Sequence, residues 1–189
     1  WGHLNAKHST LTRAQYIALD GHFIVEQTAR SRGGLFFNFN GSAGVWRRHC
    51  VQEAGGWHSD TVSEDLDLSY RAQLLGWEMR YLPEVLSLGE IPIDLPAFKR
   101  QQFRWSKGSV QCLLKHGWEV ATGSGSLWRR AQGILHLSGY LVHPLMLLLL
   151  FSSLAMVLTN VAGNLPWGIL SLAGLGPPIL YAASQVASY

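Results

Sequence analysis

Hydrophobic and polar positions divide the chain into a mixed part and an uncharged, mostly apolar part. Up to residue 130 apolar side chains are interspersed with charged ones, whereas residues 131–189 hold no Asp, Glu, Lys or Arg. At about 1.5 Å per residue, roughly 20 apolar residues in a helix cross a hydrocarbon core of about 30 Å. The pattern therefore predicts a membrane region over residues 131–189 with two spans, at residues 131–158 and 167–188.

Periodicity in the mixed part predicts helices and short strands in alternation. Helices are predicted over residues 14–29, 48–54, 61–75 and 94–117. Short strands are predicted over residues 35–39, 45–47, 77–81 and 85–88. Such alternation is typical of the α/β class.

The helix that Asp94 begins and Gly117 ends carries a distinctive face. Asp94 suits an N-cap and Gly117 suits a helix end. At 3.6 residues per turn, Gln101, Arg104 and Trp105 lie on one side. A guanidinium binds phosphate oxygens through parallel hydrogen bonds, and an indole offers an apolar platform to a sugar ring. The face therefore matches both halves of a sugar diphosphate.

A second interpretation of this helix is open. Lys99 and Lys107 are interleaved with Phe98 and Phe103, a pattern that is also typical of an amphipathic helix on an anionic membrane surface. The two interpretations are compatible, because one face can lie on lipid while another lines a pocket. Residues 94–130 are predicted to form such an interfacial helix and a linker.

Composition agrees with a membrane protein. The chain has 189 residues, a formal net charge of +3 and 14% charged residues, whereas soluble domains average about 25%. Arg129 and Arg130 precede the apolar region, which predicts a cytoplasmic mixed part by the positive-inside rule. We therefore expect an integral, multi-pass membrane protein whose basic residues lie on a lipid bilayer, with no nucleic acid partner.

The number and spacing of the cysteines and histidines indicate neither a disulfide framework nor a metal site. Cys50 and Cys112 are too few for a disulfide framework and have no partner at metal-ligand spacing. The eight histidines form no HxxxH or HExxH pattern, so they are interpreted as scattered structural residues. The chain starts at Trp1 and stops at Tyr189 within an apolar run, and we expect it to be a piece of a longer protein.

Two further stretches have both a structural and a functional interpretation. Thr61 and Glu64 match a capping box, and Glu64 with Asp65 suits the first turn of a helix. Residues 39–44 hold two glycines among small residues, which allows a close approach of ligand or backbone but is more often a plain turn. Neither stretch indicates a site by itself.

Three motifs occur in order before the predicted spans: Phe39-Asn40-Gly41-Ser42, Ser63-Glu64-Asp65 and Gln101-x-x-Arg104-Trp105. Together they resemble the processive family-two inverting glycosyltransferases, the cellulose-synthase-like enzymes. Residues 18–23, 40–47 and 64–73 are similar to the glucomannan (β-mannan) synthase branch and its bacterial relatives. The resemblance implies that residues 1–93 are the C-terminal half of a GT-A catalytic domain.

The resemblance also implies roles for the acidic motif and the helix face. Asp65, next to Glu64, would be the general base, with Ser63 in place of the usual Thr. Gln101 and Arg104 would hold the donor diphosphate. A divalent metal, Mg or Mn, is expected in the longer enzyme, with its ligands mostly outside this chain.

The remaining motif residues are implied to bind the acceptor glycan. Trp105 would stack beneath the terminal sugar, and Phe39, Asn40, Gly41 and Ser42 would shape the acceptor end of the pocket. Asn40 stands where cellulose synthases have Cys, which weakens a specific assignment to cellulose.

The implied reaction transfers a hexose from a nucleotide sugar, GDP-mannose or UDP-glucose, to a growing β-linked polysaccharide of the cell wall type. Two alternatives remain. One is a hyaluronan, chitin or other β-glucan-type synthase with the same motifs. The other is a non-catalytic membrane-anchored module in which Glu64 and Asp65 only begin a helix and the basic helix binds lipid.

Overall fold

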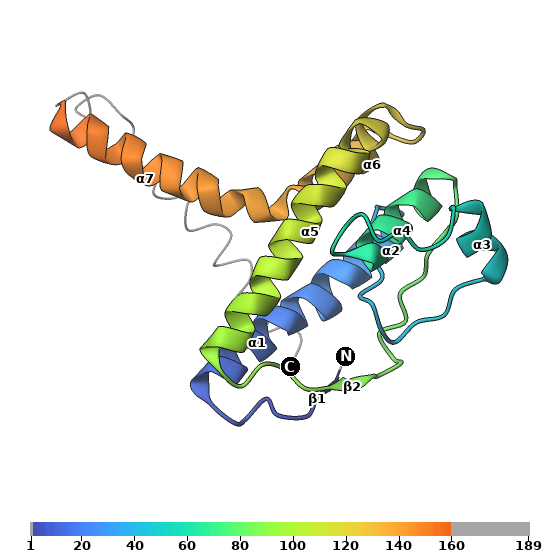
Figure 1. Cartoon of the computed structure of the whole chain (residues 1–189), viewed down its shortest axis with the longest axis horizontal. Coiled ribbons are helices and arrows are strands. Elements are labelled where there is room, and N and C mark those ends of the chain that lie inside the picture. Colours follow the sequence, from blue (N-terminus) through green and yellow to red (C-terminus); the bar gives the residue numbers. More distant parts are fainter. Residues whose placement is uncertain (1, 160–189) are drawn as a thin grey trace. The chain divides into compact units, whose positions relative to one another are not determined.

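The computed structural model describes residues 2–159 and divides into two compact units (Figure 1). The first unit comprises Trp1–Tyr140 and the second Leu141–Tyr189. The second predicted span, residues 167–188, lies outside the described residues.

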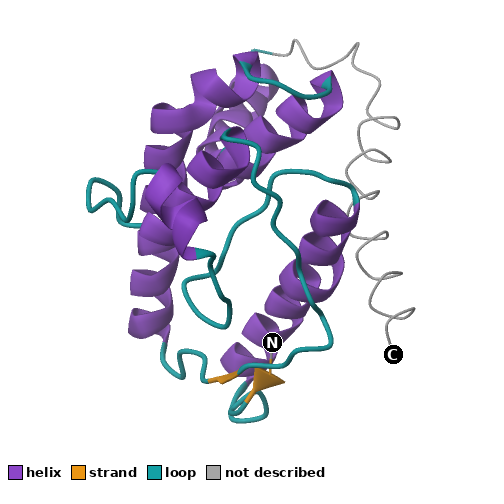
Figure 2. Cartoon of the chain, turned by 90° about the vertical axis from the view of Figure 1, so that its right-hand side faces the viewer, coloured by secondary structure: helices purple, strands orange, loops and turns teal. Residues whose placement is uncertain are grey.

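The described residues are mainly helical, as Figure 2 shows. The elements in order are β1 (Gly2–His3), α1 (Thr10–Asp20), the π-helix η1 (Gly21–Gln27), α2 (Thr28–Arg32), α3 (Arg48–Glu53), α4 (Glu64–Leu74), β2 (Leu88–Gly89), α5 (Leu95–Thr122), α6 (Leu127–Leu137), the 3₁₀ turn η2 (Gly139–Leu141) and α7 (Val142–Leu158). β1 and β2 pair in parallel, with Gly2 opposite Leu88. The expected α/β pattern is thus present only as this short pair in the described part.

Two predicted strands are extended segments without a strand partner in the described part, and the side chains of helices replace that partner. Gln73 on α4 accepts a hydrogen bond from the Phe37 amide at 3.2 Å and donates one to the Phe37 carbonyl at 2.7 Å. The Tyr81 amide donates to Ser31 Oγ at 3.0 Å. The strand predictions for residues 35–39 and 77–81 are therefore wrong, because helix side chains satisfy the backbone groups that a sheet would have bonded.

The other predicted strands differ as well. Residues 45–47 form no strand, and they lead directly into α3, which confirms the helix predicted over residues 48–54. Residues 85–88 contribute only Leu88 to β2.

The first predicted helix is longer than its apolar pattern indicated. Ser9 caps α1 by accepting a hydrogen bond from the Thr12 amide at 3.2 Å, while Thr12 Oγ1 accepts one from the Ser9 amide at 2.8 Å. This reciprocal box starts the helix at Thr10 rather than residue 14. The helix continues through η1 into α2 and ends at Arg32.

Helix α4 begins at Glu64, with Ser63 as its N-cap residue. The predicted capping by Thr61 is wrong, since Thr61 is buried before the helix and the Ser63 side chain makes no cap bond. Helix α4 contacts α3 on one side and α5 on the other (Figure 1).

Helix α5 begins as predicted and ends later than predicted. Asp94 accepts a hydrogen bond from the Ala97 amide at 2.7 Å, which confirms it as the N-cap. Gly117 does not end the helix, because α5 continues to Thr122 and places Val120 in the main core. A Cβ atom there would be 3.3 Å from Leu113 Cδ1 and 3.9 Å from Ile134 Cδ1.

Helices α5 and α6 form a hairpin over the main core. Ser109 Oγ donates a hydrogen bond to the Leu137 carbonyl at 2.7 Å. Gly133 lets α6 approach so closely that a Cβ atom would be 2.8 Å from both Phe36 and Val120. The main core contains Phe36, Tyr70, Cys112, Val120 and Leu137. Because Tyr70 belongs to α4, this core fixes α4 against the hairpin.

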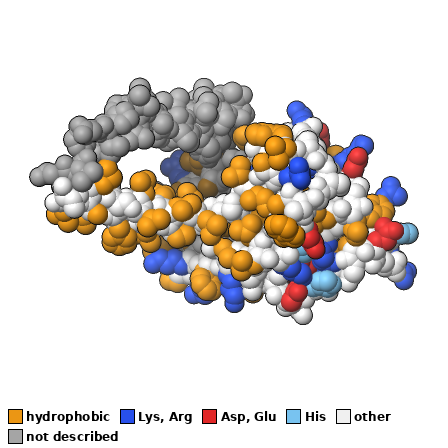
Figure 3. Space-filling view, turned by 90° about the horizontal axis from the view of Figure 1, so that it is seen from above, with side chains coloured by type: hydrophobic (Ala, Val, Ile, Leu, Met, Phe, Trp, Pro, Cys, Tyr) orange, Lys and Arg blue, Asp and Glu red, His pale blue; other side chains and the backbone are white. Residues whose placement is uncertain are grey.

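A candidate membrane span, Gly139–Met156, begins at the end of the first unit and runs through α7 of the second. The span predicted over residues 131–158 is thus shortened, because residues 131–137 belong to α6, which packs in the first unit. The side chains of α7 are mostly hydrophobic and exposed, and Figure 3 shows hydrophobic side chains along this helix at the left of the view. This helix is long and apolar enough to cross a membrane by length and composition.

Candidate active site

The first turn of α4 presents the acidic motif. Glu64 is exposed to solvent, whereas the neighbouring Asp65 is half-buried. Asp65 Oδ1 accepts a hydrogen bond from the Leu66 amide at 2.8 Å, so one carboxylate oxygen is held by the helix start. Of the two predicted catalytic carboxylates, only Asp65 is therefore partly enclosed.

The loop that follows Phe39 lies directly against this carboxylate. Gly41 has a φ of +76°, which favours glycine, and a Cβ atom at Gly41 would be 3.1 Å from Asp65 Oδ2. Ser69 joins the two segments, because its hydroxyl accepts from the Phe39 amide at 2.9 Å and donates to the Asp65 carbonyl at 2.6 Å. The first two motifs, 26 positions apart from Phe39 to Asp65, are thus neighbours.

Helix α5 meets the same helix start at Gly108. A Cβ atom at Gly108 would be 2.6 Å from Ser63 Cβ and 3.3 Å from the Ser63 amide nitrogen, so only a glycine permits this approach. Arg104 lies one turn earlier on the same face of α5 and is exposed. Its charge acts on Asp65. Arg104 of the third motif is therefore near enough to the second motif for its charge to act on Asp65.

Gln101 and Trp105 lie on the face of α5 that carries Arg104, and both are half-buried. In the loop, Phe39 and Asn40 are half-buried, while Gly41 and Ser42 are exposed. The Phe39 ring contacts Trp46 edge to face, with ring centroids 5.8 Å apart. The predicted acceptor residues are thus divided between the loop and α5.

Burial raises the pKa of Asp65 above the usual carboxyl value. The adjacent negative charge of Glu64 acts in the same direction. The Leu66 amide and the positive charge of Arg104 act in the opposite direction without cancelling the effect of burial. A carboxylate with a raised pKa accepts protons more readily, which is the property that a general base needs.

Sequence reasoning missed a cluster of polar side chains on η1 that contacts the loop of Asn38 and Asn40. His22 Nδ1 lies 3.0 Å from Glu26 Oε2, and His22 Nε2 lies 3.3 Å from Asn40 Oδ1. Gln27 Nε2 donates to the Asn38 carbonyl at 3.2 Å. These three helix residues belong to η1, and π-helical turns are frequent at functional sites.

Glu26 in this cluster is firmly ionised. Burial favours its neutral form, but hydrogen bonds from His22 and Arg30 outweigh that effect and lower the pKa of Glu26 to about 2. The sequence signal for the cluster is the spacing of His22, Glu26 and Arg30, which lie four residues apart on one helix.

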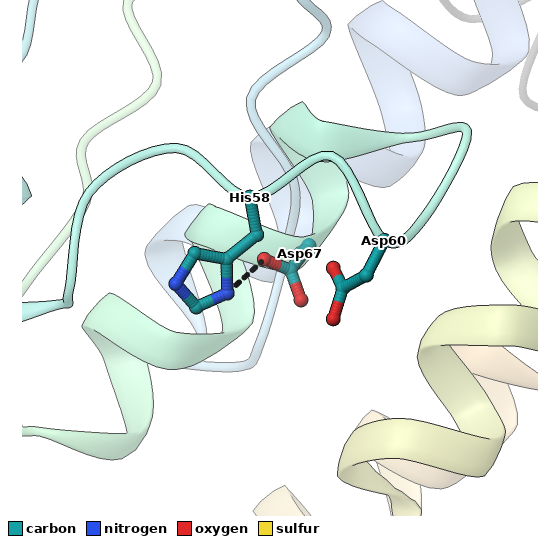
Figure 4. A group of neighbouring side chains, drawn as sticks. All are labelled: His58, Asp60 and Asp67. Carbon is teal, nitrogen blue, oxygen red and sulfur yellow. Dashed lines mark ion pairs between the residues drawn. The ribbon is translucent and has the colours of Figure 1, made fainter.

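One group of side chains has the spacing of a metal site. The ligand atoms of His58, Asp60 and Asp67 all lie within 4.8 Å of one another, and Figure 4 shows them converging from α4 and the preceding loop. The Lys115 ammonium lies among these three side chains, however. Its Nζ is 2.8 Å from Asp67 Oδ1, 2.8 Å from Asp60 Oδ2 and 3.3 Å from His58 Nδ1.

The Lys115 amine remains protonated at this position. Burial favours the neutral amine, but hydrogen bonds to Asp60 and Asp67 raise the pKa of Lys115 above its usual value, so the cation persists. A divalent ion would have to share the space with this charge. His58, Asp60 and Asp67 therefore fit an ammonium and do not fit a divalent metal.

Comparisons with known proteins give a consistent result. The model of the family described as "Glycosyl transferase family group 2" matches residues 3–184. A probable glucomannan 4-beta-mannosyltransferase 6 of Oryza sativa subsp. japonica is 44% identical over 131 residues, which cover 69% of this chain and 23% of that protein. Glucomannan 4-beta-mannosyltransferase 9 of Arabidopsis thaliana is 40% identical over 135 residues, covering 71% of this chain and 25% of that protein. The chain spans about a quarter of the length of these relatives. No solved structure matches it significantly.

Proposed function

The chain belongs to the glycosyl transferase family group 2, and from this premise we propose that it is part of a membrane-bound inverting glycosyltransferase. The enzyme transfers a hexosyl unit from a nucleotide sugar to a growing β-linked polysaccharide. The similar glucomannan 4-beta-mannosyltransferases favour GDP-mannose as the donor, with UDP-glucose second. The observation that carries the proposal is the convergence of the Gly41 loop and the Arg104 helix on the half-buried Asp65.

In this proposal Asp65 is the general base. A sugar hydroxyl is a weak nucleophile, so the carboxylate removes its proton while the oxygen attacks the anomeric carbon of the donor. The bond from that carbon to the nucleoside diphosphate breaks on the opposite side. An α-linked donor therefore gives a β-linked product. The raised pKa of Asp65 supports this role.

Arg104 and Gln101 would hold the departing diphosphate. The leaving group gains negative charge as its bond breaks, and the exposed guanidinium on the Asp65 side of α5 is suited to stabilise it. A divalent metal would add to this stabilisation when bound. Its ligands would come from residues outside this chain, since the His58, Asp60 and Asp67 group is matched to Lys115.

Acceptor binding would use an aromatic surface and the loop. Trp105 offers the flat apolar face on which the terminal sugar would stack. Phe39, Asn40, Gly41 and Ser42 would shape the other wall. The close approach of Gly41 to Asp65 supports this assignment, because a loop that touches the base also lies beside the attacking hydroxyl.

Membrane attachment would combine an interfacial hairpin with spanning helices, and the catalytic part would face the cytoplasm. Leu114 and Trp118 are 81% and 79% exposed on the side of α5 away from the core. Trp128 and Leu135 are 66% and 60% exposed on α6. These apolar surfaces support an interfacial position for residues 94–130, and α7 supports a membrane region that starts beyond α6.

The proposal is tested by transfer assays on membranes that hold the full-length protein, washed with carbonate to remove peripheral proteins. The membranes are offered radiolabelled GDP-mannose, UDP-glucose or UDP-N-acetylglucosamine separately. We expect incorporation from GDP-mannose into a polymer that an endo-β-mannanase degrades. Incorporation only from UDP-N-acetylglucosamine would favour a chitin- or hyaluronan-type enzyme. Loss of all incorporation, with the protein still in the membrane, would contradict an enzymatic role.

The pH dependence of transfer should change when the charge of Arg104 is removed. Activity requires ionised Asp65, so transfer increases as pH rises through the pKa of Asp65. Arg104 lowers that pKa, and Arg104→Gln should therefore move the acidic limb of kcat/KM to higher pH, whereas Arg104→Lys should leave it in place. The matched control is Arg100→Gln, an exposed cation one turn earlier on α5. If the acidic limb of the kcat/KM profile lies at the same pH in Arg104→Gln and in the wild type, the charges of Arg104 and Asp65 do not interact.

A further inference from the structure

Both oxygens of the buried Asp67 carboxylate accept hydrogen bonds from protein side chains. Its side chain has no exposed surface. Oδ1 accepts from Lys115 Nζ and His116 Nε2, each at 2.8 Å, and Oδ2 accepts from Arg71 Nε at 2.8 Å and Arg71 Nη2 at 2.7 Å. Both oxygens are therefore occupied by protein donors.

These partners come from separate parts of the first unit. Arg71 lies on α4 itself, and its Nη2 also donates to the Gly56 carbonyl at 2.7 Å. Lys115 and His116 lie on α5. Lys115 extends the network to Asp60 in the loop before α4. One carboxylate thus connects α4, α5 and the loop over residues 55–60.

We propose that Asp67 is a positioning residue: together with Lys115, His116 and Arg71, it holds the first turn of α4 against α5 and thereby keeps Asp65 opposite Arg104. This inference rests on the proposed function for its consequence in catalysis. Its structural content, the fixed placement of α4 on α5, can be tested without any activity.

The geometry explains why an ionic contact is needed at this point. Ser63 meets Gly108 on α5, and Asp67 meets Lys115 and His116 about two turns further along. An apolar contact would tolerate sliding or rotation of α4, because dispersion and hydrophobic burial have little directionality. A carboxylate that must satisfy four donors has a single placement, because a buried charge that loses a partner is strongly unfavourable.

Asp65 and Asp67 therefore have separate roles within one helical turn. Residues two apart point about 200° apart around a helix, so Asp67 can face α5 while Asp65 faces the Gly41 loop. The letters Asp-x-Asp here do not describe a pair of metal ligands. Asp65 would act on the substrate, and Asp67 would act only through the position of Asp65.

The test compares Asp67→Asn with Asp60→Asn in the full-length protein. Asp60 shares Lys115 but is exposed, so its loss leaves the bonds to Asp67 intact. Spin labels are attached at two exposed positions outside the site, Leu75→Cys near the end of α4 and Leu114→Cys on α5. The native Cys50 and Cys112 are buried, which limits their labelling, and accessible cysteines elsewhere in the full-length protein are replaced by Ser first.

We expect Asp67→Asn to broaden the distribution of distances between the labels and Asp60→Asn to leave it narrow. In transfer assays Asp67→Asn should lower kcat by about 10- to 100-fold with KM changed less than about threefold, since small misplacement of a catalytic group has effects of this size. The acidic limb of the kcat/KM profile should also move to higher pH, because a displaced Asp65 no longer has its pKa lowered by the charge of Arg104. A purely structural role would change the amount of folded enzyme and none of these readouts.

A second variant covers the case in which Asp67→Asn does not fold. His116→Leu removes one donor and leaves Asp67 bonded to Lys115 and Arg71, so it should give smaller shifts in the same directions. Wild-type label distances and wild-type kcat in the variant that folds would overturn the proposal. If the wild-type protein transfers no sugar from any donor, the proposed function fails, while the label distances still decide whether Asp67 positions α4.

Discussion

Replacing Asp65 by Asn should abolish polysaccharide elongation while leaving the protein inserted in the membrane. Asn has nearly the same size and can still accept the hydrogen bond from the Leu66 amide, so the first turn of α4 should persist. It cannot accept a proton from the acceptor hydroxyl at neutral pH. Loss of a general base typically costs about 10²- to 10⁴-fold in rate. The measurement is initial incorporation of radiolabelled hexose by washed membranes, normalised to the amount of enzyme.

The matched control for this prediction is Asp60→Asn, which makes the same chemical change at an exposed carboxylate. Its transfer rate should stay within about threefold of the wild type, since exposed ion pairs contribute little to stability. Residual elongation above about a tenth of the wild-type rate in Asp65→Asn would show that another group accepts the proton.

Gly108→Ala should have the second large effect, on both stability and transfer. A Cβ atom at Gly108 would overlap the Ser63 side chain and lie 3.3 Å from the Ser63 amide nitrogen, so the start of α4 would have to move away from α5. Overpacking of this kind typically costs about 1–3 kcal/mol. Because Asp65 follows Ser63 by two residues, the displacement should also separate Asp65 from Arg104. Thermal unfolding and transfer of the detergent-solubilised enzyme measure the two effects.

Two further variants test whether the clash with Ser63 causes the effect of Gly108→Ala. Gly117→Ala lies on the same helix, where a Cβ atom would be 3.3 Å from the flexible end of Leu113 and 3.9 Å from Ile134, an ordinary contact distance, so it should be nearly neutral. Adding Ser63→Gly to Gly108→Ala removes the overlapping Cβ and should restore most of the lost stability and transfer. Ser63 makes no side-chain cap bond, so its replacement by Gly is itself mild. A double variant no better than Gly108→Ala would contradict the close packing of α4 on α5.

The errors in the predicted elements have one physical origin. The extended segments around Phe37 and Tyr81 have the composition of strands, but strands also require a partner backbone. In the described residues that partner is replaced by the side chains of Gln73 and Ser31. Gly117 likewise has the local features of a helix end, whereas α5 continues past it because Val120 packs in the main core.

The candidate site was predictable where residue type carries the chemistry. A carboxylate at a helix start, and a cation and an indole on one face of another helix, are recognisable without coordinates. The contributions of His22, Glu26 and Gln27 were not predictable, because each acts by reaching the loop of Asn38 and Asn40 across the fold. The network around Asp67 was hidden for the same reason.

By itself the sequence determined the family, the three motifs, the N-cap of α5 and the apolar helix that can cross a membrane, because residue identity and short spacing express these features directly. Only the tertiary structure decided which motifs meet. It placed Gly41 against Asp65 and placed Arg104 where its charge acts on Asp65. It also placed Asp67 in a buried network of ion pairs with protein cations and not in a metal site. Those outcomes depend on how α4 packs on α5 at Gly108, a contact between residues 45 positions apart, and no local pattern records such a contact.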